Sequence, residues 1–316
     1  MGTSFEPTDA QTAGSPEAAE RSALSSRDNA ALAALLPWPA ADANKYARGK
    51  LYLVAGAASY PGAARLAAGA AERAGAGYVE LFCAGKTLLA VRCGAQPSLV
   101  ARDWRAWHPT RLEKPRPGHP TACVIGCGFE GDAFERALLA KTLRAFAGPV
   151  LVDGGALGLI ADETGRRLAA ERAHEGTGPL VLTPHGGEAA RLARDASLDD
   201  ELEAPELAAA LARAYRALVV LKGPITFIAD ESGNVEKMER GTPALAKAGT
   251  GDALAGIIGA LMAQGLAPRD AAALGCALHA EAGRAAAAEL TEICAGAQDV
   301  IDCLPRAVRF IAGRDR

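Results

Sequence analysis

Ala248-Gly249-Thr250-Gly251-Asp252-Ala253-Leu254 is a glycine-rich turn that leads directly into an apolar helix. The helix is predicted from a spacing of three and four residues between apolar positions. These positions are Leu254, Ile257, Ile258, Leu261 and Met262. Glycines let successive backbone amides converge on an anion, and the positive end of a helix favours the same ligand. Asp252 fits such a site only if it moves a proton, meets a metal or binds a hydroxyl; the alternative is a helix N-cap.

Upstream of this turn, short apolar runs alternate with alanine-rich stretches. Strands are predicted at 51–55, 78–83, 123–125, 150–152, 180–182 and 218–221, with a hairpin joining 226–229 to 235–239. Helices are predicted at 63–74 and 133–146, and the last third of the chain is mostly helical. Continuously apolar strands separated by helices indicate a buried sheet with helices on both faces. The sequence therefore predicts an α/β fold, a three-layer α/β/α domain around a mainly parallel sheet.

The composition excludes several classes of protein. The 316 residues carry a net charge of −3, which gives no electrostatic reason to expect nucleic acid or a membrane as a partner. Seven cysteines without a Cys-x-x-Cys pair predict reduced thiols in a cytoplasmic protein. Residues 1–40 are predicted to be a disordered or poorly ordered tail, and 41–316 a single domain. Deleting residues 1–28 is accordingly expected to leave activity intact.

The segment from Arg102 to Pro120 interrupts the alternation of strands and helices. It contains two tryptophans, several arginines and four prolines. We expect it to cross the surface before the next strand begins. A basic and aromatic nucleic-acid patch is the alternative, and the acidic balance of the chain disfavours it.

Polar residues follow several of the predicted strands, where open α/β sheets bind their ligands. In Thr183-Pro184-His185-Gly186-Gly187-Glu188, His185 and Glu188 share one turn and could bind a polar substrate and a hydrated cation. The alternative is an ordinary helix start with a glutamate in its first turn. Lys222 follows four apolar residues and could meet a phosphate, unless it is a solvated surface lysine. Asp153 follows another apolar strand, at a position suited to contact with a charge or a hydroxyl.

In their order and spacing, these motifs resemble the ribokinase-like ADP- or ATP-dependent NAD(P)H-hydrate dehydratases. The resemblance spans about residues 44–312. The motifs that carry it lie at 45–50, 60–64, 71–77, 126–128, 153–157, 183–188, 221–223 and 249–252. The chain departs from the family pattern at Cys127, Gly154, Gly186 and Ala248. If position 248 required a positive φ, alanine there would cost about 1 kcal/mol and would shift a bound phosphate.

The resemblance implies a metabolite-repair reaction. The S epimer of NADHX or NADPHX, the hydrated forms of the nicotinamide cofactors, would be dehydrated to NADH or NADPH with ADP or ATP, and ADP is the favoured donor. Asp252 would take the proton of the ring hydroxyl as this attacks the terminal phosphate. The residues implied to bind the hydrate are Ala63, Gly128, His185 and Asp252. Those implied to bind the nucleotide are Lys222, Gly223, Pro224, Ile225, Thr226, Gly249, Thr250 and Gly251.

The resemblance also implies Mg²⁺ as a cofactor, positioned through water by Glu188. It further implies a homo-oligomer and a separate epimerase acting upstream, since only about 40 residues precede the motifs. Two alternatives share the fold: a kinase for a sugar, hydroxymethylpyrimidine or thiazole alcohol, and a catalytically silent nucleotide-binding homologue. His185 favours the dehydratases, because sugar kinases of this fold usually have asparagine there.

Overall fold

The computed structural model describes residues 24–112, 114–199 and 202–314. Within these residues the chain forms one sheet of nine strands, in the order β3-β2-β1-β4-β5-β6-β7-β8-β9. The strands are β1 (Lys50–Val54), β2 (Tyr78–Cys83), β3 (Val100–Asp103), β4 (Thr121–Ile125), β5 (Val150–Val152), β6 (Leu180–Leu182), β7 (Leu218–Leu221), β8 (Thr226–Ala229) and β9 (Val235–Met238). Neighbouring strands are parallel from β3 to β7, and the pairs β7–β8 and β8–β9 are antiparallel.

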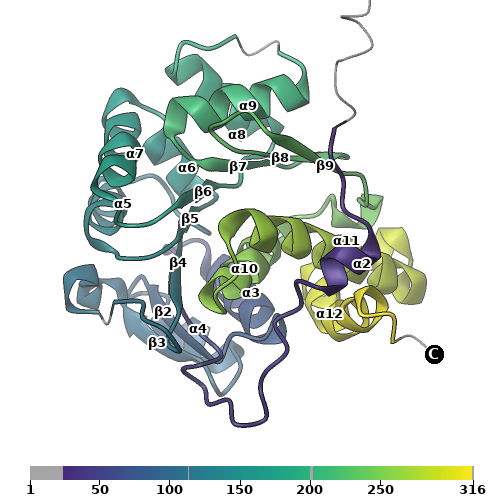
Figure 1. Cartoon of the computed structure of the whole chain (residues 1–316). Helices are drawn as coiled ribbons and strands as arrows, with labels where there is room; N and C mark the ends of the chain where they lie inside the picture. Colours follow the sequence, from purple (N-terminus) through teal and green to yellow (C-terminus); the bar gives the residue numbers. More distant parts are fainter. Residues whose placement is uncertain (1–23, 113, 200–201, 315–316) are drawn as a thin grey trace, which may run out of the picture.

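Helices cover both faces of this sheet (Figure 1). One layer contains α2 (Asn29–Ala33), α3 (Pro61–Arg73), α4 (Leu88–Gly94), α10 (Thr250–Ala263), α11 (Pro268–Cys294) and α12 (Ala297–Ile311). The other contains α5 (Ala133–Ala145), α6 (Gly155–Ile160), α7 (Glu163–Glu175), α8 (Gly186–Asp195) and α9 (Ala204–Tyr215). Successive residues of a strand point to opposite faces, so Leu51 and Leu53 join the first core and Tyr52 and Val54 the second. Both faces are therefore apolar, as the sequence predicts for a buried parallel sheet.

The predicted three-layer fold is confirmed, with two corrections. The strands at 78–83, 150–152, 180–182, 218–221 and 226–229 have the predicted bounds. The segment from Arg102 to Pro120 is not wholly a surface crossing, because its first residues complete β3 at the edge of the sheet. Sequence inspection missed β3 because only four residues form it and two of them are charged. No helix in the described ranges is both long enough and apolar enough to cross a membrane.

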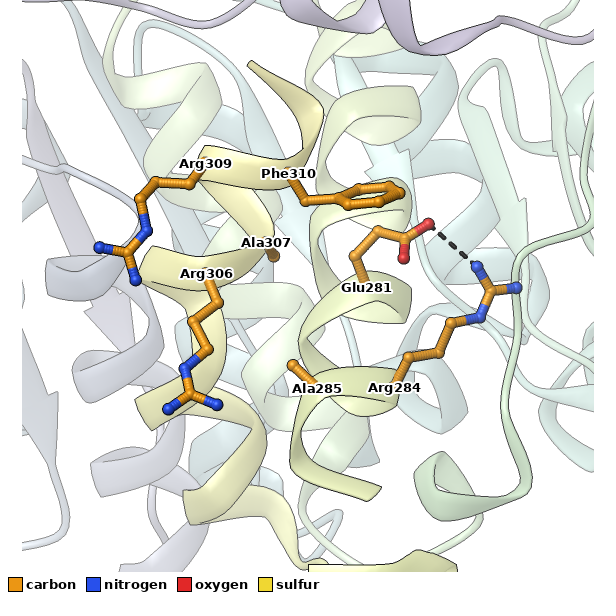
Figure 2. A pocket seen from close by; sticks show the side chains of 7 residues that line it. All are labelled: Glu281, Arg284, Ala285, Arg306, Ala307, Arg309 and Phe310. Atoms are coloured by element: carbon orange, nitrogen blue, oxygen red, sulfur yellow. Dashed lines mark hydrogen bonds and ion pairs between the residues drawn. The ribbon is translucent and has the colours of Figure 1, made fainter. Parts of the chain in front are cut away.

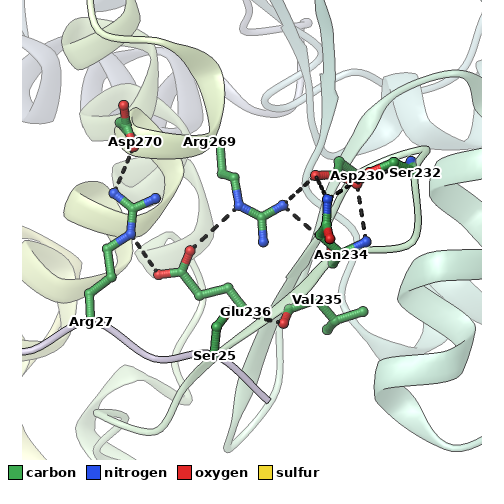
Figure 3. A network of polar contacts seen from close by, with 9 residues as sticks. All are labelled: Ser25, Arg27, Asp230, Ser232, Asn234, Val235, Glu236, Arg269 and Asp270. Atoms are coloured by element: carbon green, nitrogen blue, oxygen red, sulfur yellow. Dashed lines mark hydrogen bonds and ion pairs between the residues drawn. The ribbon is translucent and has the colours of Figure 1, made fainter. Parts of the chain in front are cut away.

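The second correction concerns the N-terminal segment. The prediction of a poorly ordered tail through residue 40 is wrong from residue 24 onward, while residues 1–23 lie outside the described part of the chain. Arg27 places its Nε 3.1 Å from Glu236 of β9 and its Nη1 2.6 Å from Asp270 of α11 (Figure 3). The carbonyl of Ser25 accepts a hydrogen bond from the Lys237 amide at 2.8 Å. The segment is ordered because two carboxylates, brought together only by the fold, bind one guanidinium.

This contact changes the expectation for N-terminal deletion. Removing residues 1–28 takes Arg27 away from Glu236, which is 3% exposed and keeps only Arg269 at 3.6 Å. A buried carboxylate that loses one of its two cationic partners destabilises a protein by about 1–3 kcal/mol. We therefore expect deletion of 1–28 to lower the Tm by several degrees in differential scanning calorimetry. Deletion of 1–23 is the matched control and should leave the Tm unchanged; equal Tm values for the two truncations would contradict a structural role for Arg27.

Candidate active site

Three neighbouring strands each deliver one polar residue to the carboxyl edge of the sheet. Asp153 follows β5, Thr183 follows β6 and Lys222 follows β7. The Asp153 Oδ1 accepts a hydrogen bond from the Thr183 hydroxyl at 2.6 Å and lies 2.9 Å from the Lys222 Nζ. Burial lowers the pKa of Lys222, but the charges of Asp153 and Glu188 outweigh this effect and raise it above 10.5. Lys222 is therefore a buried, paired cation, and the alternative of a solvated surface lysine is wrong.

Asp252 lies in the first turn of α10, next to this pair. The N-cap of α10 is Gly249, so the alternative that Asp252 caps the helix is wrong. Burial, followed by the charge of Asp153, raises the pKa of Asp252 to about 6, although Lys222 acts in the opposite direction. Ligand atoms of Cys127, Asp153 and Asp252 all lie within 4.8 Å of one another. A carboxylate with a pKa near neutrality is suited to accept a proton during a reaction.

His185 and Glu188 form the start of α8. The His185 Nδ1 accepts from the Gly187 amide at 3.1 Å, and the Glu188 Oε2 accepts from the His185 amide at 2.8 Å. This reciprocal arrangement is a capping box, so the helix-start interpretation is correct for both residues. It does not exclude a role in binding. Because Nδ1 accepts, the neutral ring has its hydrogen on Nε2, and the ring lines the pocket described next.

A pocket of about 790 Å³ opens beside Lys222 and the start of α10. Of the predicted nucleotide-binding residues, its lining includes Lys222, Gly223, Pro224, Thr226, Thr250 and Gly251. Ile225 and Gly249 are outside this lining, and Ile225 packs against the second core. The remaining wall is largely apolar and includes Met238, Pro243, Leu245, Leu254 and Ala280. The volume and this combination of apolar walls with a few polar groups are typical of a site for a small organic ligand.

Ala63 and Gly128 meet away from this pocket, near Asp252. A Cβ on Gly128 would come within 2.8 Å of the Cβ atoms of both Ala63 and Tyr60. Gly128 follows Cys127, whose Sγ donates to the Asp153 Oδ2 at 3.7 Å and lies within 4.8 Å of a carboxylate oxygen of Asp252. Asp252 does not line the 790 Å³ pocket, but the preceding residue, Gly251, does. Of the predicted hydrate-binding residues, His185 lines the same pocket as the predicted nucleotide-binding residues, whereas Ala63, Gly128 and Asp252 do not.

Comparisons with known proteins identify the family. The family model for NAD(P)H-hydrate dehydratase matches residues 51–306. The chain belongs to this family. It is 35% identical over 288 residues to the bifunctional NAD(P)H-hydrate repair enzyme Nnr of Moorella thermoacetica, covering 87% of this chain and 52% of that protein. The chain thus spans about half the length of this relative.

Two further relatives are matched over nearly their whole length. The ADP-dependent (S)-NAD(P)H-hydrate dehydratase of Xanthomonas campestris is 32% identical over 282 residues, which are 85% of this chain and 94% of that protein. The ADP/ATP-dependent NAD(P)H-hydrate dehydratase of Bacillus subtilis, co-crystallised with ATP and Mg²⁺, superposes with a TM-score of 0.75. The two sequences are 26% identical, and the superposition covers 91% of this chain and 99% of the Bacillus subtilis chain. The ribokinase-like fold is therefore shared with dehydratases.

The alanine that departs from the dehydratase pattern does not strain the anion-binding turn. Within the described residues, positive φ outside glycine occurs at Ser197, Arg216 and Thr291, and not at Ala248. The positive φ of this turn, 93°, belongs to Gly249. A Cβ there would also lie 2.5 Å from the Leu66 Cδ1, so glycine is required at 249 and alanine is tolerated at 248. Ala248 therefore gives no structural reason for a silent site.

Sequence inspection missed His279, which lines the same pocket from α11. The residue is 7% exposed, and within the described residues its Nε2 has no hydrogen-bond partner. Burial lowers the pKa of His279 to about 4, so its ring is neutral at physiological pH. A lone histidine in an alanine-rich helix gives no functional signal in the sequence. Its unsatisfied nitrogen in an otherwise apolar wall identifies it here.

The carboxylates of this candidate site fit a hard divalent cation. Asp153, Glu188 and Asp252 lie around one lysine, and burial raises the pKa of Glu188, with Lys222 opposing. This excess of oxygen ligands over cations is the environment that Mg²⁺ prefers. The nearby Cys127 thiol is a poor Mg²⁺ ligand, and its burial holds its pKa well above the usual value, so it stays protonated. Glu188 and Asp153 are therefore the residues with suitable donor atoms.

Proposed function

We propose that this chain converts the S epimer of NADHX or NADPHX to NADH or NADPH at the expense of an adenine nucleotide. One observation carries the proposal above all others. Asp252, with a pKa of about 6, lies in the first turn of a glycine-rich helix start, and the preceding residue, Gly251, lines a ligand-sized pocket. A base at an anion site beside a ligand-sized pocket is the arrangement that phosphoryl transfer to a hydroxyl requires.

In the proposed reaction, Asp252 removes the proton of the ring hydroxyl as its oxygen attacks the terminal phosphorus of the nucleotide. With ADP, the bond from this phosphorus to the bridging oxygen breaks and AMP leaves. The carbon–oxygen bond of the resulting phosphate ester then breaks, phosphate departs, and loss of the ring proton restores the dihydropyridine. Lys222 and the positive end of α10 stabilise charge on the transferred group. Lys222 is well placed, because its Nζ would lie 3.4 Å from a Cβ on Gly251.

The nucleotide would occupy the 790 Å³ pocket, with its phosphates toward Lys222 and Gly251 and its base among the apolar residues. The neutral His279 imidazole would offer its unpaired Nε2 to a polar edge of that base. When bound, Mg²⁺ would supply positive charge to the phosphates, and Glu188 and Asp153 would hold it directly or through water. His185 would bind the hydrate through its Nε2.

ADP is the proposed donor, since the Xanthomonas campestris relative is named ADP-dependent. The Bacillus subtilis relative is named for both nucleotides, so ATP is the alternative donor. Assembly into a homo-oligomer and a separate epimerase acting upstream stay predictions.

The test is absorbance at 340 nm with NADHX, Mg²⁺ and either ADP or ATP. We expect a rise with equimolar release of phosphate, faster with ADP, because NADH absorbs at this wavelength and its hydrate does not. A mixture with Mg²⁺ chelated by EDTA is the control and should give no rise. If neither nucleotide supports a rise while both bind in calorimetry, the dehydratase proposal is wrong.

A further inference from the structure

A second pocket, of about 450 Å³, lies at the opposite edge of the sheet from Asp252. It is lined by Tyr46, Lys50, Tyr52, Arg111, Leu112, Arg116, His119, Pro120 and Thr121, and is called here the strand-start pocket. Lys50 and Thr121 are the first residues of β1 and β4 and face each other in the sheet register. The catalytic residues follow the last residues of their strands, and a strand of five residues spans roughly 15 Å. The strand-start pocket is therefore separate from the proposed active site.

The lining is positively charged. The cations that carry this charge are Lys50 and Arg111, and none of the described side chains of the lining is a carboxylate. Glu80 pairs with Lys50 at 2.7 Å, but it also pairs with Arg102 at 2.5 Å, so one acid serves two cations. Because the charge is incompletely neutralised, an anion entering the pocket gains electrostatic energy.

The surroundings of Arg111 show the same excess of positive charge. Within the described part of the chain, Arg111 has no carboxylate partner, and Lys141 and His108 lie nearby. Burial and then the charge of Arg111 lower the pKa of Lys141. The pKa of His108 is lowered by the charge of Lys141, then by burial and by Arg111. Neighbouring positive charge thus contributes to both shifts, together with burial.

A buried polar atom points to a ligand in the same place. The Thr121 Oγ1 is buried without a hydrogen-bond partner in the described structure, and the residue is 6% exposed. Buried hydroxyls are nearly always satisfied, so this one calls for an explanation. A ligand oxygen in the strand-start pocket, which Thr121 lines, would satisfy it.

The outer wall of the pocket is aromatic. Tyr46 stacks on His119, with ring centroids 5.8 Å apart and planes inclined by 21°. His119 is held by a tight turn in which Arg116 and His119 exchange both backbone hydrogen bonds, at 2.9 and 3.3 Å. Tyr46 is 43% exposed, so part of its ring is accessible, and the Lys45 Nζ lies 5.1 Å from its centroid. A flat ring can stack there while a charged substituent reaches the cations.

Another basic groove in the molecule lacks a buried unsatisfied polar atom among its described residues. It lies between α11 and α12 and displays Arg284, Arg306 and Arg309 (Figure 2). There Glu281 accepts from Arg284 at 3.0 Å, and Arg306 pairs with Glu289. No side-chain atom that lines this groove is among the buried unsatisfied atoms of the described residues. Positive charge and an exposed aromatic ring, which is Phe310 in this groove, occur in both places, and the buried unsatisfied hydroxyl distinguishes the strand-start pocket.

We propose that the strand-start pocket binds a small planar organic anion, an aromatic ring that carries a phosphate group. The phosphate would lie against Arg111, Lys50 and the Thr121 hydroxyl, and the ring would stack on Tyr46. This assigns a binding function to the arginine- and proline-rich segment before β4, which the proposed reaction does not use.

The probe is phenyl phosphate, titrated into the full chain by isothermal calorimetry with ADP at saturation to occupy the nucleotide pocket. We expect binding at one site, at least about tenfold weaker in Arg111→Gln, because a charge-assisted hydrogen bond is lost. Arg105→Gln is the matched control, since Arg105 lies in the same segment with its side chain 80% exposed and outside the pocket; it should bind like wild type. Equal binding by wild type and Arg111→Gln, or no binding at all, would overturn the proposal.

Thr121→Val gives a second readout that a purely structural threonine would not produce. Valine has the same shape without the hydroxyl, so we expect weaker phenyl phosphate binding and a higher Tm of the ligand-free protein. Inorganic phosphate alone should bind more weakly than phenyl phosphate by about tenfold or more, because it lacks the ring. Equal binding of the two anions would refute the aromatic part of the proposal. These titrations do not depend on NADHX turnover, so their failure is distinct from failure of the proposed reaction.

Discussion

We expect Asp252→Asn to lower kcat for NADHX dehydration by at least about 10³-fold, because the amide cannot accept the proton of the ring hydroxyl. ADP binding should change by only a few-fold, since the side chain of Asp252 is not part of the nucleotide pocket. Initial rates at 340 nm and calorimetric titration with ADP measure the two effects. Asp299→Asn is the matched control, because Asp299 holds the same third position of helix α12 and should leave turnover intact.

The pH dependence tests the same assignment. With a pKa of about 6 for Asp252, activity should rise as pH increases through 6 and level off above 7. In the folded protein the pKa of Asp252 lies above its ordinary value of 3.8. Between pH 3.8 and about 6 the folded state therefore binds more protons than the unfolded state, and the free energy of unfolding falls as the pH rises through this range. Asp252→Asn, which removes this buried charge, should therefore stabilise the protein at pH 7.5, by on the order of 2–3 kcal/mol. Unaltered turnover, or a lower Tm at pH 7.5, would remove Asp252 from the proposed role.

Lys222→Met should be the most destabilising of the substitutions considered. Asp153 is buried, 3% exposed, and would lose its cation while keeping the hydrogen bonds from the Thr183 hydroxyl at 2.6 Å and the Cys127 thiol at 3.7 Å. Breaking a buried ion pair from one side costs about 3–5 kcal/mol. Dehydration should also slow by about 10²-fold or more, because Lys222 no longer stabilises the transferred phosphate. Chemical denaturation measures the first effect and the 340 nm assay the second.

Two variants control for the general loss of a lysine. Lys237→Met removes an exposed partner of Glu239 and should cost less than about 1 kcal/mol, as is typical of surface pairs. Lys222→Met combined with Asp153→Asn should recover much of the lost stability, since no buried charge is then left unpaired. If the double variant is as unstable as Lys222→Met, the ion pair is not the source of the effect.

Several features of this protein follow from local sequence. The three-layer fold could be predicted because continuously apolar strands must be buried on both faces, and helices must then cover them. Asp252, His185 and Lys222 could be selected because each lies at a strand end or a helix start, positions that bring polar groups to one edge of a sheet. The short edge strand β3 could not be predicted, because its charged residues give no apolar pattern.

Other features depend on contacts between residues distant in the chain. The pKa of Asp252 is set by its burial and by the charge of Asp153, about a hundred positions earlier. The ion pair of Asp153 with Lys222 likewise joins residues that are distant in the sequence. The tolerance of alanine at 248 depends on which residue of the turn has positive φ, and the order of the segment around Arg27 depends on β9 and α11. The role open to His279 and the unsatisfied Thr121 hydroxyl became visible only in their pockets. Sequence determines which groups can form hydrogen bonds or carry charge. The pKa values of these groups, and whether their hydrogen bonds are made, depend on burial and on partners, which are properties of the folded chain.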